Sequence, residues 1–362
     1  MLYSPVCLWH VRGPLSDQEH RVQSGPISKA WQSASRRYLG GYTPQQAVTR
    51  LSRRAISPLL VRTTSLGTHD IRDTLLVAGS PRSGTTFLAE LLNQIPRSAI
   101  LFEPEHIQQV PEARQAGLTW HTIKYPGDDW AQGRRFFERV LRGRLITSWT
   151  VSHVPLPSAV APRVWIVKFV DANFMLGWLA SQFPVRAPVL LIRHPCAVIA
   201  SQLRRGWSNP HPPRLKGFLA RYPQFTEYLE TLRDPAEFAA ALWSMQTYAP
   251  LMLPKPWPFV PVTYEELASN PQGELARLFD TWQMPMPAGI VERALRPSGT
   301  TDSGSPLAGG ADPSSAWRRA LSPSQVDGIL AVVRTFGLDF YDAAPRPNLA
   351  KLAAFGSSGS SA

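Results

Sequence analysis

The chain has 362 residues, and 44% of them are hydrophobic, which indicates a globular protein with a real core. It is long enough for one large domain with appendages or for two small domains. The net charge of +12, almost all of it from arginine, favours an anionic partner. Nucleic acid, a membrane surface, a sulfated or phosphorylated ligand and an anionic glycan all fit that sign.

The cysteines and the apolar runs indicate where the protein works. Cys7 and Cys196 are too few for a disulfide framework and are compatible with a reducing compartment. No run reaches the ~18 uninterrupted apolar residues that a membrane span needs. The N-terminus, "MLYSPVCLWHVRG", lacks the charged start and apolar run of a signal peptide. The sequence therefore predicts a soluble, cytoplasmic protein.

Strand and helix patterns alternate along most of the chain. Residues 1–70 are basic and irregular, with one helical pattern in "TPQQAVTRLSRRA". Beyond them, four apolar runs predict buried strands: "TLLVAG", "VWIVKF", "PVLLIR" and "PFVPVTY". These runs lack strict alternation, which suits a parallel sheet covered on both faces. We expect a three-layer α/β fold with a central, mainly parallel sheet flanked by helices.

Composition divides the chain into three parts. A basic extension, residues 1–70, precedes a main domain, residues 71–345, and a tail, residues 346–362, that we expect to be disordered. Within the main domain, an insertion at about 206–235 is rich in proline and aromatic residues. A Gly/Ser/Thr-rich loop and a predicted helix near its end make up a further segment, at about 297–335.

The stretch "LLVAGSPRSGTTFLAELLNQ" predicts a strand, a tight turn and an amphipathic helix. Backbone N–H groups of such a turn, with a helix N-terminus behind them, form a cradle for an anion. The hydroxyls of Ser83, Thr85 and Thr86 add donors around Gly84, and Arg82 adds a charge. Thr85 stands where a nucleoside-triphosphate loop carries its lysine, which disfavours an ATPase or a kinase.

A second stretch, "VLLIRHPCAVIASQLRR", supplies an independent anion site. A buried strand ends on Arg193, Pro195 breaks the chain, and a helix is expected from about Ala197. Ser201 lies one or two turns into that helix, so its hydroxyl and the Arg193 guanidinium can converge on one group. Such a pair suits a dianionic phosphate monoester. Together the two stretches predict a ligand with two separate phosphate positions.

These motifs resemble those of a known enzyme family. "PRSGTTFL" looks like the 5′-phosphosulfate-binding motif of sulfotransferases, with Arg82 where other members carry Lys or Arg. The pair Arg193 and Ser201 resembles their 3′-phosphate-binding motif. The resemblance covers about residues 72–335, with the order of motifs intact. It implies a P-loop-type fold and 3′-phosphoadenosine-5′-phosphosulfate (PAPS) as the donor.

Three further segments are similar to segments of that family. Glu103, in "ILFEPEH", stands where carbohydrate and tyrosylprotein sulfotransferases place a catalytic glutamate. Tyr264, in "FVPVTYEELASNP", stands where the family's tyrosine lies near the adenine. "SSAWRRALSPSQ" is like the late segment that closes over the donor, which implies that Trp317 and Arg318 reach its phosphates.

The resemblance also implies a mechanism. Glu103 would accept the proton of an acceptor hydroxyl during in-line displacement, and Glu105 is the alternative base. Lys168 and Arg82 would stabilise charge on the transferred or leaving group. The sequence offers no convincing equivalent of the histidine base of the cytosolic small-phenol enzymes. It shows no persuasive metal cluster, and we expect no metal requirement.

The acceptor is less closely defined. Aromatic residues of the insertion, Trp207 among them, suit sugar rings or hydrophobic alcohols, or they pack a loop onto the core. We expect a hydroxyl-bearing carbohydrate or glycolipid and disfavour nucleic acid. Two alternatives stay open, which are another P-loop nucleotide or small-molecule kinase and a catalytically silent nucleotide-binding module.

Overall fold

A computed structural model of the chain describes residues 69–153, 161–207, 210–295, 312 and 314–356. The helix expected in "TPQQAVTRLSRRA" lies outside the described residues, as does nearly all of the basic N-terminal extension. Most of the Gly/Ser/Thr-rich loop lies outside them too. Among the described residues, none of the helices is both long enough and apolar enough to cross a membrane.

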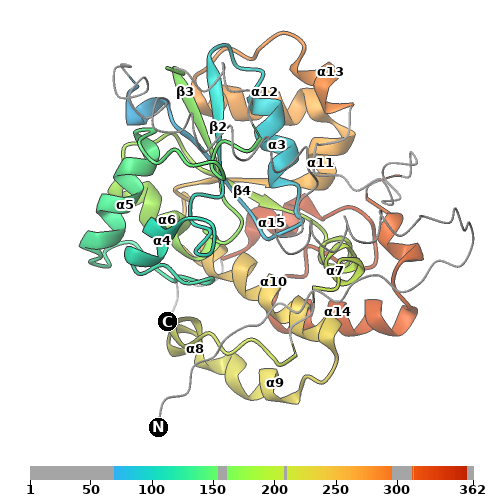
Figure 1. Cartoon of the computed structure of the whole chain (residues 1–362). Coiled ribbons are helices and arrows are strands. Elements are labelled where there is room, and N and C mark those ends of the chain that lie inside the picture. Colours follow the sequence, from blue (N-terminus) through green and yellow to red (C-terminus); the bar gives the residue numbers. More distant parts are fainter. Residues whose placement is uncertain (1–68, 154–160, 208–209, 296–311, 313, 357–362) are drawn as a thin grey trace, which may run out of the picture.

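A five-stranded parallel sheet forms the centre of the fold (Figure 1). Its order is β2-β3-β1-β4-β5. The strands are β1 (Leu75–Ala78), β2 (Ser98–Phe102), β3 (Val164–Lys168), β4 (Val189–Ile192) and β5 (Val260–Thr263). This arrangement confirms the α/β fold class and the four predicted strands. The sequence analysis did not predict β2, an edge strand whose five residues are all buried.

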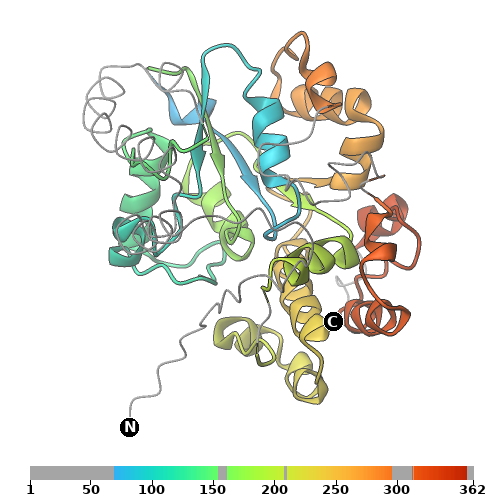
Figure 2. The same ribbon diagram turned by 45° about the vertical axis from the view of Figure 1, so that its right-hand side comes forward.

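Helices cover both faces of the sheet, because strands buried on both sides need apolar partners on each. On one side lie α5 (Ala131–Leu141) and α6 (Leu176–Gln182), and α4 (Pro111–Gln115) lies near them (Figure 2). On the other side lies α3 (Thr85–Leu92), which contacts β1, β2 and β3. Beside α3 lie α11 (Tyr264–Ser269), α12 (Pro271–Trp282) and α13 (Ile290–Ala294).

A further group of helices packs below the sheet in the view of Figure 1. The long helix α10 (Pro235–Leu251) contacts α7 (Pro195–Arg204) and α14 (Pro323–Thr335). The expected insertion contains two short helices, α8 (Lys216–Arg221) and α9 (Thr226–Thr231). The 3-10 helices are η1 (Ile71–Asp73), η3 (Asn173–Met175), η4 (Pro223–Phe225) and η5 (Ala316–Arg319).

The expectation of a disordered tail from residue 346 is wrong for its first part. Residues Leu349–Ala354 form α15, with the Asn348 side chain accepting the Lys351 N–H at its start. Leu352 is buried, and the Phe355 ring lies 6.1 Å from the Phe340 ring. These apolar contacts supply the burial that the polar composition of the tail did not suggest. Residues 357–362 lie outside the described residues.

Local sequence signals explain where several helices begin. Before α10, Asp234 accepts the Ala236 N–H at 2.7 Å, and Glu237 accepts the Asp234 N–H at 3.1 Å, which makes a capping box. The helix after β4 begins at Pro195, two residues earlier than expected, because proline is well tolerated in the first helical position. Pro195 therefore opens α7 rather than separating it from the strand.

All five strands point the same way, so their carboxyl ends meet at one edge of the sheet. In parallel α/β folds, ligands bind outside that edge. The loop 79–84 follows β1, Glu103 follows β2, and Lys168 ends β3. Arg193 follows β4, and Tyr264 follows β5. The fold therefore brings residues from five distant stretches of sequence to one edge.

We expect Asp234→Ala to lower the free energy of unfolding by about 1 kcal/mol, because the first turn of α10 loses its cap. Urea denaturation measures this change. Asp234→Asn, which keeps a side-chain oxygen able to accept the Ala236 N–H, is the control and should lose much less. Equal losses for the two variants would show that the cap hydrogen bond is not the source.

Candidate functional site

The loop between β1 and α3 has a backbone that requires glycine at two positions. At Gly79, an added Cβ would lie 2.5 Å from the carbonyl oxygen of Leu191. At Gly84, φ is +100°, and an added Cβ would lie 2.5 Å from Cδ2 of Tyr264. Arg82 also has a positive φ, +77°, which is uncommon for a residue with a side chain. The loop is therefore held in one tight conformation against its neighbours.

One hydroxyl of this loop has no hydrogen-bond partner among the described residues. Ser83 donates its backbone N–H to the Ser80 carbonyl at 3.0 Å. Its hydroxyl is buried and has no hydrogen-bond partner among the described residues. Thr85 and Thr86 are buried in the first turn of α3, which no side chain of the described residues caps. An orphaned buried hydroxyl at an uncapped helix N-terminus fits an anion cradle.

The two predicted phosphate motifs contact each other directly. Arg82 donates Nε–H to the Ser201 hydroxyl at 3.0 Å. Arg193 donates to the Arg82 carbonyl at 3.1 Å, and Gln202 donates to the Pro81 carbonyl at 3.1 Å. Residues more than a hundred positions apart are therefore joined by three hydrogen bonds. One of them is made by the Arg82 side chain, which contacts Ser201.

Tyr264 joins both motifs. Its ring lies beneath the Arg193 guanidinium, at 4.3 Å, and 5.9 Å from the Phe87 ring of α3. A guanidinium over an aromatic face is a cation–π contact, which holds the Arg193 side chain in place. Because the same ring lies against Gly84, it also limits what can stand at that position of the loop.

The late segment packs against the residue that follows Arg193. The Trp317 ring stacks on the His194 ring at 4.7 Å and is buried. Arg318 is exposed and donates to the Ala343 carbonyl at 2.6 Å. His194 accepts the Cys196 N–H, which leaves Nε2–H to donate to the Asp342 carbonyl at 2.9 Å, and burial lowers its pKa to about 4. His194 is therefore a neutral structural residue.

At the β2–β3 end of the same edge, Glu103 and Lys168 form a buried ion pair. Their side chains are 13% and 3% exposed, so water screens the pair little. The backbone of Glu103 has φ +43° and donates its N–H to the Lys168 carbonyl at 2.9 Å. Trp149 donates its ring N–H to the Glu103 carbonyl at 3.2 Å. Several contacts thus hold Glu103 in an unfavourable backbone conformation.

Two further carboxyl groups lie beside this pair. Glu105 accepts the Val170 N–H at 2.8 Å, and burial together with the Glu103 charge raises its pKa to about 8. Asp171 accepts a hydrogen bond from the Gln246 amide at 3.1 Å, and burial, with the Glu103 charge, raises its pKa to about 7. Three carboxyl groups therefore lie near one lysine, and the pKa values of two of them are raised.

Sequence reasoning named Glu105 as an alternative base but missed Asp171 and His121. Asp171 lies three residues after Lys168, a spacing that could have drawn attention to it. His121 Nδ1 lies 3.7 Å from Asp171 Oδ1, and burial lowers the pKa of His121 to about 4. At neutral pH this contact is therefore not an ion pair. No local signal links His121 and Gln246 to the site, because both come from distant elements.

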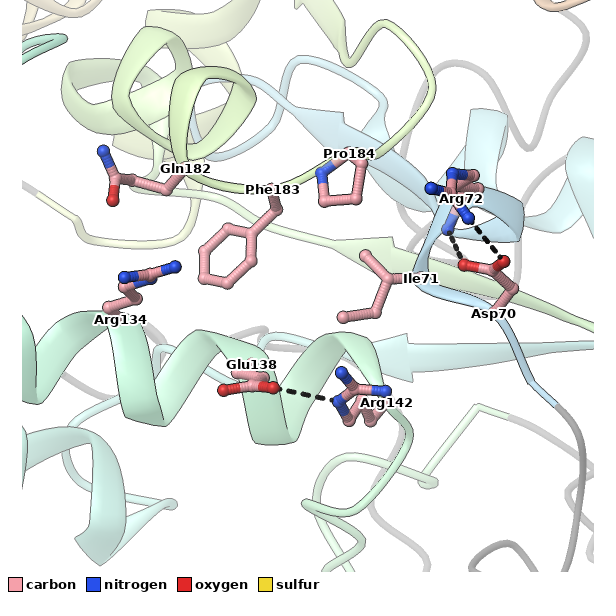
Figure 3. Close-up of a pocket in the computed structure, with 9 residues that line it drawn as sticks. All are labelled: Asp70, Ile71, Arg72, Arg134, Glu138, Arg142, Gln182, Phe183 and Pro184. Atoms are coloured by element: carbon pink, nitrogen blue, oxygen red, sulfur yellow. Dashed lines mark hydrogen bonds and ion pairs between the residues drawn. The ribbon is translucent and has the colours of Figure 1, made fainter.

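A pocket of about 310 Å³ lies elsewhere (Figure 3). It is lined by residues that precede β1 and β4, which places it at the amino end of the sheet, and by α5. Along the α5 wall of the pocket Arg142 pairs with Glu138, and before β1 Arg72 pairs with Asp70. None of the sequence-predicted site residues lines it. The described residues also hold no group of three or more side chains suited to a metal ion.

Comparison with known proteins identifies the family of the chain. A model of the sulfotransferase family matches residues 74–288, more than half of the chain. The chain therefore belongs to the sulfotransferase family. The match includes the loop 79–84, the Glu103–Lys168 pair, Arg193, Ser201 and Tyr264, and it ends before Trp317. No curated protein sequence matches the chain.

Several solved structures are similar at low identity. The sulfotransferase domain of the Synechococcus PCC 7002 olefin synthase is 18% identical, with 76% of this chain and 98% of that chain covered, at a TM-score of 0.43. A sulfotransferase from Alicyclobacillus acidocaldarius is 15% identical, with 79% and 95% covered, at 0.38. Mouse sulfotransferase SULT7A1, solved with PAP, is 12% identical, with 79% and 94% covered, at 0.37.

We expect Gly84→Ala to destabilise the fold by more than about 2 kcal/mol, because left-handed strain and a clash with Tyr264 add together. Gly127→Ala is the matched control, since Gly127 has φ +93° and no atom within 4 Å of an added Cβ. It should lose only the backbone term, about 1 kcal/mol. Denaturant titration measures both. Similar losses would mean that contact with Tyr264 does not constrain the loop.

Proposed function

We propose that this family member transfers a sulfuryl group from PAPS to a hydroxyl group of a carbohydrate or glycolipid. The observation that carries the proposal is the contact between Arg82 and Ser201. It joins a cradle suited to one phosphate and a basic site suited to another, as a ligand phosphorylated at both ends requires. The donor, when bound, supplies an activated sulfuryl group and a phosphate leaving group.

The residues at the β1 end fit the 5′-phosphosulfate. The orphaned Ser83 hydroxyl, with Thr85, Thr86 and the first N–H groups of α3, would bind it. No metal ion is part of the proposal. These donors are fixed before the ligand arrives, so they can stabilise charge that develops on the leaving group without reorganisation.

The residues at the β4 end fit the 3′-phosphate. The guanidinium of Arg193 offers a fork of donors. Ser201 lies in α7, the helix that follows Arg193, and offers a hydroxyl. Arg82 contacts Ser201, so its charge serves this end as well as its own loop. Tyr264 would lie near the adenine. Trp317 supports this end by stacking on His194, and Arg318 would reach toward the donor phosphates.

Glu103 is the proposed general base. Lys168 binds its Oε1, which leaves Oε2 to take the proton from the acceptor hydroxyl as the oxygen attacks sulfur. The same ammonium group places a positive charge beside the oxygens of the transferred group. The strained backbone of Glu103 is consistent with a residue placed for function rather than for stability.

Aromatic side chains beside Glu103 support a sugar-bearing acceptor. The His106 ring lies 4.9 Å from both the Trp120 and the Trp149 rings, and Trp149 contacts Glu103. Flat aromatic surfaces suit the apolar faces of sugar rings. The net charge of +12 also tolerates an anionic glycan. The cytoplasmic location stays a prediction.

We expect Glu103→Gln to lower turnover about 10²–10⁴-fold while leaving donor-product affinity unchanged, because the base is lost but the phosphate sites are intact. A transfer assay with radiolabelled donor over a panel of glycans, glycolipids, steroids, phenols and peptides measures turnover. Calorimetry with adenosine 3′,5′-bisphosphate measures affinity. Undiminished turnover would remove Glu103 from its role, and bisphosphate binding without transfer to any acceptor would favour a silent module.

We expect Arg193→Ala to weaken adenosine 3′,5′-bisphosphate binding about 10- to 100-fold, since a charged hydrogen bond contributes about 1.5–3 kcal/mol. Binding of adenosine 5′-phosphate should change much less. Arg204→Ala is the matched control, because it removes an exposed positive charge from the end of α7, the helix that follows Arg193. Equal weakening of both nucleotides would contradict the assignment of Arg193 to the 3′-phosphate.

A further inference from the structure

Glu105 is a buried carboxyl group that the proposed chemistry does not use. Only 5% of the residue is exposed. Its Oε1 accepts the Val170 N–H at 2.8 Å, and its Oε2 is buried without a partner among the described residues. A charged carboxylate with an orphaned buried oxygen is costly, whereas a protonated one loses much less. The burial therefore favours an uncharged Glu105.

The contact with Val170 is part of a connection between two loops. Where β2 and β3 end, the Glu103 N–H donates to the Lys168 carbonyl, and the side chains of these two residues form the ion pair. Two residues further along each chain, Glu105 binds the Val170 N–H. The segments 103–105 and 168–170 are thus joined at three points. The last of these points holds the backbone immediately beyond Lys168.

Two charges act on Glu105 in opposite directions. The Glu103 charge opposes its ionisation, whereas the Lys168 charge favours it. His106 and His121 also lie in this cluster, and burial lowers the pKa of each, so that they are neutral near pH 7. A second full negative charge would compete with Glu103 for the one lysine. Burial, reinforced by the Glu103 charge, accordingly raises the pKa of Glu105 to about 8.

We propose that Glu105 is a positioning residue that acts as an uncharged carboxylic acid, holding the Val170 amide and thereby fixing Lys168 against Glu103. The inference rests on the proposed function, in which Glu103 is the base. Ionisation of Glu105 draws Lys168 away from Glu103 and weakens catalysis. Transfer therefore declines as the pH rises through the range where Glu105 loses its proton.

Neutral and truncated variants separate this role from that of a base. Glu105→Ala removes the acceptor for Val170 and should lower transfer about 10²-fold, because the catalytic pair is misplaced. Glu105→Gln keeps a neutral oxygen acceptor of the same shape, so it should lose far less activity than Glu105→Ala. It should also lose the alkaline decline that Glu105 causes. Glu227→Gln, an exposed carboxyl on α9, is the control and should keep the wild-type pH profile.

A second measurement does not depend on transfer. Burial and the Glu103 charge raise the pKa of Glu105 in the native state from 4.5 to about 8. Between these values the native state binds more protons than the unfolded state, so the stability contributed by Glu105 falls as the pH rises. The urea midpoint of Glu105→Gln should therefore rise relative to wild type from about pH 5 to about pH 8. The Glu227→Gln midpoint should show no such trend.

The outcomes are distinct. A midpoint difference that does not change with pH overturns the inference, because Glu105 is then ionised in the native protein at neutral pH. Glu105→Gln as inactive as Glu105→Ala overturns it too, since a charged or basic group is then required. Glu105→Ala as active as wild type removes the positioning role. Absence of transfer by the wild-type protein, with the expected midpoint trend, would count against the proposed function and leave the uncharged state of Glu105 established.

Discussion

The parallel alignment of the five strands is the constraint on which the site depends. Because every strand ends at the same edge, the loops that follow them gather side chains whose positions in the sequence span nearly two hundred residues. β1 lies at the centre of the sheet, so its phosphate-type loop has β3 on one side and β4 on the other. The acidic cluster and the second basic site are therefore placed on opposite sides of one anion cradle.

Burial of charge is the second constraint, and it makes the edge rigid. The pair of Glu103 and Lys168 is almost wholly removed from water. Removing one partner of such a pair typically costs about 3–5 kcal/mol, since the other charge is left buried. Two further carboxyl groups, Glu105 and Asp171, stand nearby with pKa values raised by burial. Strongly shifted pKa values are common at catalytic sites, although buried structural networks shift them too.

The phosphate end is organised by a different kind of contact. Here the neutral aromatic rings of Tyr264 and Trp317 support Arg193 and His194, which connect β4 to α7. Glu265, which follows Tyr264, is buried and accepts hydrogen bonds from the His194 N–H and the Tyr341 hydroxyl. These contacts tie the late part of the chain to the edge of the sheet. The two ends of this edge thus differ in charge, with an acidic cluster at β2 and β3 and a basic side chain, Arg193, after β4.

Local patterns were enough to predict the strands at β1, β3, β4 and β5, because uninterrupted apolar runs have few alternatives to burial in a sheet. They also predicted the loop from Gly79 to Gly84, where the backbone conformation itself requires glycine. They did not predict β2, although its five residues make it as long as β3 and longer than the other three strands, or α15, which is only six residues long. The Gly/Ser-rich end of the tail misled the expectation for its first part, in which Phe355 packs on Phe340 and Tyr248.

The sequence by itself determined the fold class, the order of the motifs and the residue types available for binding phosphate. Those properties depend on near neighbours, through apolar periodicity, glycine conformation and helix capping. Only the tertiary structure decided that Arg82 reaches Ser201, that Lys168 pairs with Glu103, and that Asp171 meets His121 and Gln246. The pairing of side chains and the shift of their pKa values depend on distance and burial, and the folded chain fixes both.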